Sequence, residues 1–152
     1  MKQFRFKLQA VLEYRAEQVN LVQQKVAEAE KQRQEIAARL KEYDAAIEQA
    51  FADQQRALGE PVIDPLRMQN FPGYLWRLRQ FRFMEFQLLQ QQDQKLRAIR
   101  EELKQALIKR KSLEVLKDKE YAKYRKRIEK EEEAFLAEIA LNRLTRRMVQ
   151  TR

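Results

Sequence analysis

The side chains that could do chemistry are few and poorly placed for it. Glu131, Glu132 and Glu133 form the densest group of carboxylates, but consecutive helical residues point in different directions and cannot converge on one ion or proton. The chain has no histidine or cysteine to complete a metal site or activate a nucleophile. Gly59 and Gly73 lie too far apart for a phosphate-binding loop. We therefore expect no enzyme, cofactor, metal or small-molecule substrate, and interpret the acidic run as a solvated helix face.

The basic residues are concentrated in the second half. The net charge is +9; residues 1–58 carry ten basic and nine acidic side chains, whereas residues 74–152 carry twenty-one and twelve. This asymmetry indicates an anionic partner surface. The clusters at 109–111 and 125–127 raise the possibility of nucleic-acid binding. Acidic residues are interleaved with both clusters, so a solvated helix face is the favoured interpretation.

Helix-breaking residues are confined to one window. All glycines and prolines lie between Gly59 and Gly73, and charged residues make up 36% of the chain, against about 25% in ordinary domains. The pattern predicts an all-α fold, a single coiled-coil hairpin over 1–152. Its two long antiparallel helices would cover about 5–57 and about 74–149, joined by a turn at 58–73. Within the turn, Asp64 and Pro65 could begin a short helical segment, and the apolar side chains there should fold over the hairpin end.

The first long segment has a continuous heptad pattern. Two interleaved sets of positions, each with a period of seven, contain eleven apolar residues among fourteen. The sets are Leu8, Arg15, Val22, Ala29, Ile36, Tyr43, Ala50 and Leu12, Val19, Val26, Arg33, Leu40, Ile47, Gln54. Arg15 and Arg33 either fix the register or lay their stems along the seam with the guanidinium in water, and the second interpretation is favoured.

The apolar spacing of the second long segment drifts. Residues 90–95 are all polar, which suggests a stutter that shifts the seam. Asp93–Arg97 and Glu35–Arg39 are expected to pair along their own helices. A reversal about residue 66 would place Leu8 opposite residue 124. The second, longer helix would then project at the C-terminus by about 25 residues, with a basic face and an apolar stripe.

Six aromatic residues gather at the start of the second segment. They cannot all face one seam, so some would pack under the turn and others would form an exposed interaction surface. They are Phe71, Tyr74, Trp76, Phe81, Phe83 and Phe86. No apolar run is long enough to span a bilayer, and the start of the chain lacks the apolar core of a signal peptide, so we expect a cytoplasmic protein.

Three motifs, in order along the chain, resemble the flagellar export protein FliJ family. The first is Phe4-Arg-Phe-Lys-Leu8-Gln-Ala-Val-Leu12-Glu-Tyr-Arg15, similar to the family's opening. The second is Arg110-Lys111-Ser-Leu113-Glu114-Val-Leu116-Lys117. The third is Phe135-Leu136-Ala-Glu138-Ile139-Ala140 with a following Arg143, where Ala137 replaces a usual aspartate.

The resemblance implies a non-enzymatic coiled-coil stalk of a flagellar-type export apparatus. Its implied partners are the hexameric export ATPase, the cytoplasmic domain of the export gate and export chaperones, with the inner membrane approached only through them. The implied contact with the ATPase ring falls on a terminal tip formed by Phe4, Phe6, Leu8, Arg143, Arg146 and Arg147. The implied contact with the gate falls on Leu75, Leu78, Arg79, Arg82 and Phe86.

Two alternatives remain open from the sequence. One is a coiled-coil linker or assembly protein of another complex, which would use the same two helices with a different partner. The other is a basic helical nucleic-acid-binding protein, whose affinity would fall steeply with salt.

Overall fold

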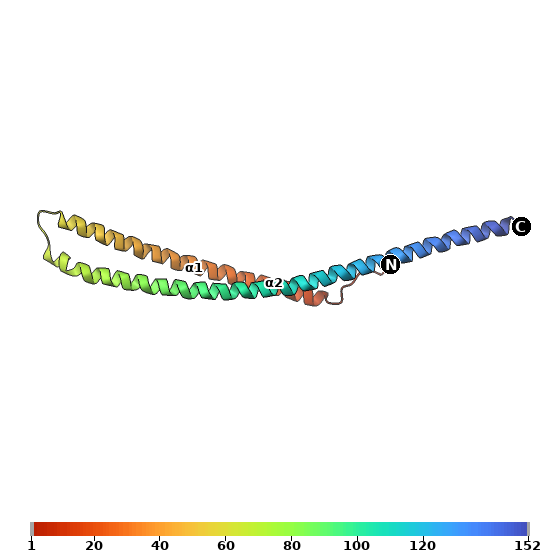
Figure 1. The fold of residues 1–152 in the computed structure, drawn as a ribbon, viewed down its shortest axis with the longest axis horizontal. Coiled ribbons are helices and arrows are strands. Elements are labelled where there is room, and N and C mark those ends of the chain that lie inside the picture. Colours follow the sequence, from red (N-terminus) through yellow and green to blue (C-terminus); the bar gives the residue numbers. More distant parts are fainter. Residues whose placement is uncertain (1, 152) are drawn as a thin grey trace. The chain divides into compact units, whose positions relative to one another are not determined.

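Two helices form the protein. The computed structural model describes residues 2–151, in which α1 covers Gln9–Leu58, α2 covers Pro65–Gln150 and no strand occurs. The helices pack against each other, so the expected all-α hairpin is confirmed (Figure 1). The chain divides into two compact units. One contains the residues up to Val19 and those from Ala106 onward, and the other contains Asn20–Gln105.

The first helix begins later than expected. Residues 2–6 are irregular, and the amide of Gln9 donates a hydrogen bond to the Phe6 carbonyl at 3.1 Å just before the regular helix. At the other end, the Gly59 amide donates to the carbonyls of Gln55 and Arg56, both at 3.2 Å. These bonds use carbonyls that have no partner at a helix end, so α1 stops at the first glycine of the chain.

The turn between the helices is shorter than expected. It covers residues 59–64, and α2 starts at Pro65 rather than near residue 74. The carboxylate of Asp64 accepts a hydrogen bond from the Leu66 amide at 3.0 Å, and Pro65 occupies the first helical position, where a missing N–H costs nothing. The predicted cap at Asp64 is therefore confirmed, but it begins the long helix itself rather than a short separate turn.

The second helix continues through Pro72. A proline inside a helix removes one backbone hydrogen bond and costs about 3 kcal/mol. Packing against α1 offsets this cost. The Phe71 ring meets the Phe51 ring edge-on with centroids 5.7 Å apart, and Leu75, one turn further on, is buried. Tertiary packing thus overrides the local signal that predicted a break at Pro72 and Gly73.

The apolar side chains of the turn do not cover the hairpin end. Val62 is 81% exposed and Leu66 67% exposed, and Ile63 is also exposed. The prediction that the window 58–73 folds over the hairpin end is therefore wrong for Val62, Ile63 and Leu66, whereas Met68 and Phe71 are half-buried in the first turns of α2. With only 59–64 outside the helices, the turn is too short to fold back.

The predicted seam of α1 is confirmed. Of its fourteen positions, all those from Leu12 to Gln54 are buried or half-buried, and Val19 is fully enclosed. Leu8 is the exception at 38% exposure, because it lies in the turn that precedes α1.

The seam of α2 also keeps a period of seven, without a stutter. Gln92, in the middle of the polar stretch, is buried at 8% exposure, and Leu89 and Leu96 on either side are half-buried and buried. The predicted shift of the seam is therefore wrong. The drift in the apolar pattern arises because polar residues occupy seam positions. The positions from the turn onward are Met68, Phe71, Leu75, Leu78, Arg82, Glu85, Leu89, Gln92, Leu96, Ile99 and Leu103.

Contacts within each unit set the antiparallel register. In residues 20–105, the rings of Tyr43 and Phe81 stack with centroids 6.0 Å apart, which puts the midpoint of this pair at residue 62. In the other unit, the Lys117 ammonium donates to the side-chain oxygen of Gln9 at 2.9 Å, with a midpoint at residue 63. The chain therefore reverses about half a heptad earlier than the expected residue 66. As a result, Leu8 does not lie opposite residue 124.

Candidate functional site

The last part of α2 has no other helix against it. From Glu129 to Thr151 every residue except Ile139 is exposed, including Leu141 at 64%, Leu144 at 57% and Met148 at 72%. Figure 1 shows this segment in blue, running on past the N-terminal segment of the same unit. A solitary helix is marginally stable in water, and exposed apolar side chains gathered on it indicate a binding surface.

The side chains of this segment sort onto different faces of the helix. Ala137, Leu141, Leu144 and Met148 follow one another at steps of four, three and four, so they form one apolar stripe. Arg143 and Arg147, four residues apart, share a face next to this stripe. Arg146 lies between that face and the face that carries Phe135. The arrangement offers apolar contact and guanidinium groups together. We call residues 135–150 the carboxyl-terminal surface.

The N-terminal aromatics take part in the packing of the chain itself. The Phe4 ring meets the rings of Tyr121 and Tyr124 with centroids 5.2 Å and 5.5 Å away, and Phe6 is buried at 7% exposure. The Tyr124 hydroxyl donates a hydrogen bond to the Lys2 carbonyl at 2.6 Å. We call these contacts the aromatic clasp, because they hold residues 2–6 against α2.

The two parts of the expected ring contact do not come together. Tyr124, which contacts Phe4, precedes Arg143 by nineteen residues on one helix, or about 28 Å at 1.5 Å per residue. Leu8 is exposed but lies on the N-terminal side of α1, with Phe4 and Phe6. Only Arg143, Arg146 and Arg147 remain as one exposed group at the C-terminal end. The expectation of a single terminal tip is therefore wrong: Phe4, Phe6 and Leu8 lie in one place on the protein, and the three arginines lie in another.

The residues expected at the gate contact differ in availability. Leu75 and Leu78 are both 8% exposed in the seam, so they offer a partner almost no surface. Arg82 forms an ion pair with Asp44 of α1. The remaining two members, Arg79 and Phe86, are exposed; the Arg79 guanidinium lies 6.0 Å from the centre of the Phe51 ring, and Phe86 is 40% exposed.

Two further aromatics on α2 are more exposed than Phe86, the one aromatic expected at the gate contact. Trp76 is 63% exposed and Phe83 54% exposed, and their spacing of seven residues puts them on one face, away from the seam. The sequence could have indicated this pair, because two aromatic residues seven positions apart and outside the seam must share one exposed face. Of the original aromatic group, Phe71 and Phe81 pack on rings of α1 rather than under the turn, whereas Trp76 and Phe83 are exposed.

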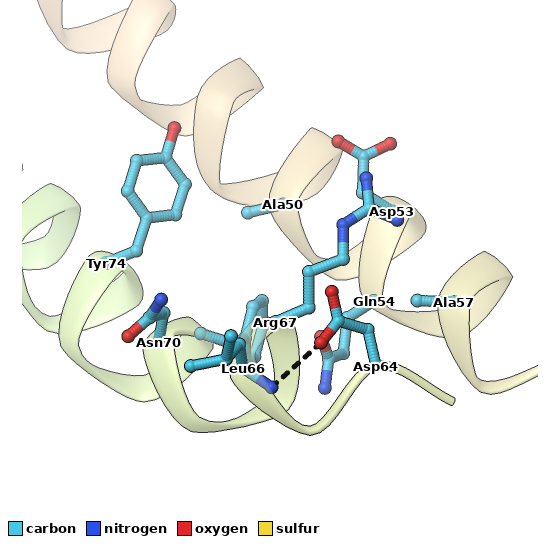
Figure 2. A pocket seen from close by; sticks show the side chains of 10 residues that line it. Ala50, Asp53, Gln54, Ala57, Asp64, Leu66, Arg67, Asn70 and Tyr74 are labelled. Carbon is cyan, nitrogen blue, oxygen red and sulfur yellow. Dashed lines mark hydrogen bonds between the residues drawn. The ribbon is translucent and has the colours of Figure 1, made fainter. Parts of the chain in front are cut away.

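An open pocket lies where α1 ends and α2 begins. Its volume is about 470 Å³, and Figure 2 shows Asp64 at its edge, accepting the hydrogen bond from the Leu66 amide. The lining residues are Ala50, Asp53, Gln54, Ala57, Asp64, Leu66, Arg67, Asn70, Phe71 and Tyr74. This set contains two carboxylates, two amides, one guanidinium and one tyrosine hydroxyl.

Residues 2–151 contain no group of three or more acidic side chains placed to hold a metal ion. Nor does either helix, over the same residues, contain a stretch long and apolar enough to cross a membrane.

Comparison with known proteins identifies the family. The family model described as Flagellar FliJ protein matches residues 4–148, almost the whole chain, so the protein belongs to the FliJ family. It is therefore a coiled-coil protein related to flagellar export. Neither the comparison with curated proteins nor that with solved structures gave a match.

Proposed function

We propose that the protein is a non-enzymatic stalk of a flagellar-type export apparatus, in which the whole chain works as one coiled-coil hairpin. It would link the hexameric export ATPase to the cytoplasmic domain of the export gate and to export chaperones. Membership of the FliJ family supports a role in export, and the carboxyl-terminal surface supports the contact with the ATPase. The protein would work in the cytoplasm and reach the inner membrane only through these partners.

The proposed contact with the ATPase uses the carboxyl-terminal surface. Its apolar stripe is unpaired within residues 2–151, and its three arginines are the only charged residues between 139 and 151. Such a surface fits a ring lumen that has apolar contacts and acidic side chains. Phe4, Phe6 and Leu8 would then assist indirectly, since the first two hold the N-terminal segment on α2.

The proposed contact with the gate uses the exposed members of the expected set. Arg79 and Phe86 are seven residues apart on one face, and Trp76 and Phe83 flank them with the same spacing. Leu75, Leu78 and Arg82 would act indirectly by packing or pairing with α1, which keeps this face in place.

Charge reversal tests the contact with the ATPase. Arg143→Glu/Arg146→Glu/Arg147→Glu should weaken binding of the full chain to the export ATPase at least tenfold at moderate salt. The matched control is Lys25→Glu/Lys31→Glu/Lys41→Glu, which makes the same charge change on exposed positions of α1 and should bind like the unaltered chain. Equal loss in both variants would indicate a nonspecific effect of net charge. Tight, steeply salt-dependent binding to DNA or RNA by the unaltered chain would favour the nucleic-acid alternative.

A further inference from the structure

Residues 20–105 contain a set of polar contacts that join the two helices across the seam. Gln92, the only polar residue buried among those described, donates a hydrogen bond from its amide nitrogen to the Ala29 carbonyl at 3.0 Å and another to the Gln32 side-chain oxygen at 3.2 Å. The buried amide of Gln92 finds both its acceptors on α1, and of the two the Gln32 side chain is specific to this alignment, because a backbone carbonyl recurs at every residue.

Four ion pairs between the helices accompany this hydrogen bond. Glu30 with Arg100 has a nitrogen–oxygen distance of 3.1 Å, and Arg39 with Glu85 has one of 3.2 Å. The other two are Arg33 with Asp93 and Asp44 with Arg82. Arg39 and Asp93 were expected to pair within their own helices, but both pair across the seam instead.

The apolar seam alone cannot choose this alignment. Its positions recur every seven residues on both helices, so sliding α2 by one heptad, or about 10 Å, returns seam positions to seam positions. The window of helix breakers also permits a second alignment. If α2 began after Pro72 and Gly73, near Tyr74, the reversal would move from about residue 62 towards residue 66. The register would then change by about one heptad.

The polar residues distinguish the two alignments. If α2 slides by one heptad into the alignment in which it starts near Tyr74, Arg33 would face Arg100, which has the same charge, and Asp44 would face Leu89. Gln92 would lie beside the larger Ile36 and would face Arg39 instead of Gln32, so it would lose its side-chain acceptor.

A slide by one heptad the other way is no better. Glu30 would then face Asp93, and Asp44 would face Leu75. In neither direction does the residue seven positions along offer a member of these pairs an opposite charge, so all four ion pairs are lost.

We infer that Gln92 and the four cross-helix ion pairs determine the register of the hairpin and, with it, the choice of Pro65 rather than Tyr74 as the start of the second helix. Each ion pair is partly exposed and individually weak, but all four favour the same alignment. A polar residue in the seam of a coiled coil specifies alignment at some cost in stability. Arg33, whose stem could also have reached solvent, belongs to this set.

Distance measurement between two spin labels tests the inference. The chain has no cysteine, so exposed Lys31 and Arg77 can be replaced by cysteine and labelled without background. The change Gln92→Glu/Arg100→Glu should favour the shifted alignment, where Glu at 92 would face Arg39 and Glu at 100 would face Arg33. We expect the label distance to lengthen by about 10 Å, seven residues of helical rise. The control Gln94→Glu/Lys104→Glu makes the same charge change on exposed positions and should keep the original distance.

A second variant covers the case in which the first fails to fold. Arg33→Leu/Arg82→Gln/Gln92→Leu removes two of the ion pairs and both hydrogen bonds of Gln92 and makes the seam more apolar, so it should remain helical. We expect this variant to show two label distances, the original one and the longer one. If this variant, or a folded Gln92→Glu/Arg100→Glu, gives only the original distance, the inference is overturned.

Discussion

The ring of Phe4 meets that of Tyr121 edge-on, at an angle of 71° and with centroids 5.2 Å apart. This contact joins an irregular segment at the start of the chain to the middle of α2, more than a hundred residues later. It gives Phe4 a structural role, and it separates Phe4 from the arginines at the end of the same helix.

Removal of the Phe4 ring should loosen the aromatic clasp. Phe4→Ala is expected to lower the free energy of unfolding by about 1–2 kcal/mol, because the ring is half-buried and contacts two tyrosines. Urea unfolding followed by circular dichroism measures the change. Phe83→Ala, at an exposed position, should change stability by no more than about 0.5 kcal/mol. Equal effects of the two changes would show that the clasp contributes nothing.

A charge placed in the seam should unfold the hairpin. Ile36 is 9% exposed, and Ile36→Asp puts a carboxylate there with no partner, at a cost of several kcal/mol. The midpoint of thermal unfolding should fall by more than 10 °C, given the usual size of such shifts for a chain of this length. Glu35→Asp on the exposed neighbour serves as the control. An unchanged midpoint for Ile36→Asp would mean that the seam is assigned to the wrong residues.

Replacement of the proline inside α2 should stabilise the protein. Pro72→Ala restores a backbone N–H that can reach the Met68 carbonyl and removes the steric clash of the ring, a gain of about 1–3 kcal/mol. Pro61→Ala, in the turn, has no helical bond to restore and is the matched control. Thermal melts of both variants measure the difference. A loss of stability in Pro72→Ala would indicate that the helix does not pass through this residue.

The sequence predicted the fold more completely than the sites. The α1 seam could be predicted because apolar residues there repeat with a strict period of seven, and burial follows them from Leu12 to Gln54. The α2 seam could not, because Arg82, Glu85 and Gln92 occupy it, and their partners on α1 are known only once the register is known. The start of α2 was misplaced for a related reason: Pro72 is a strong local breaker, and only packing across the hairpin outweighs it.

The candidate contacts were implied by the family resemblance, which does not give the exposure of each residue. The exposed arginines at the end of α2 could be identified because no acidic residue lies within four positions of them. Phe6, Leu75 and Leu78 were expected on partner surfaces, but they are buried by contacts within the chain. An apolar residue near the start of a helix can either pack in the seam or bind a partner. The sequence does not separate the two roles until the register of the two helices is known.

Removal of residues 141–152, assayed at once for helicity and for ATPase binding, tests the proposed stalk most directly. Residues 141–151 are all exposed, so the shortened chain should keep the thermal midpoint of the full chain and lose only the helical signal of the deleted residues. We predict that it no longer binds the hexameric export ATPase. A shortened chain that stays helical and binds the ATPase as tightly as the full chain would contradict the proposal.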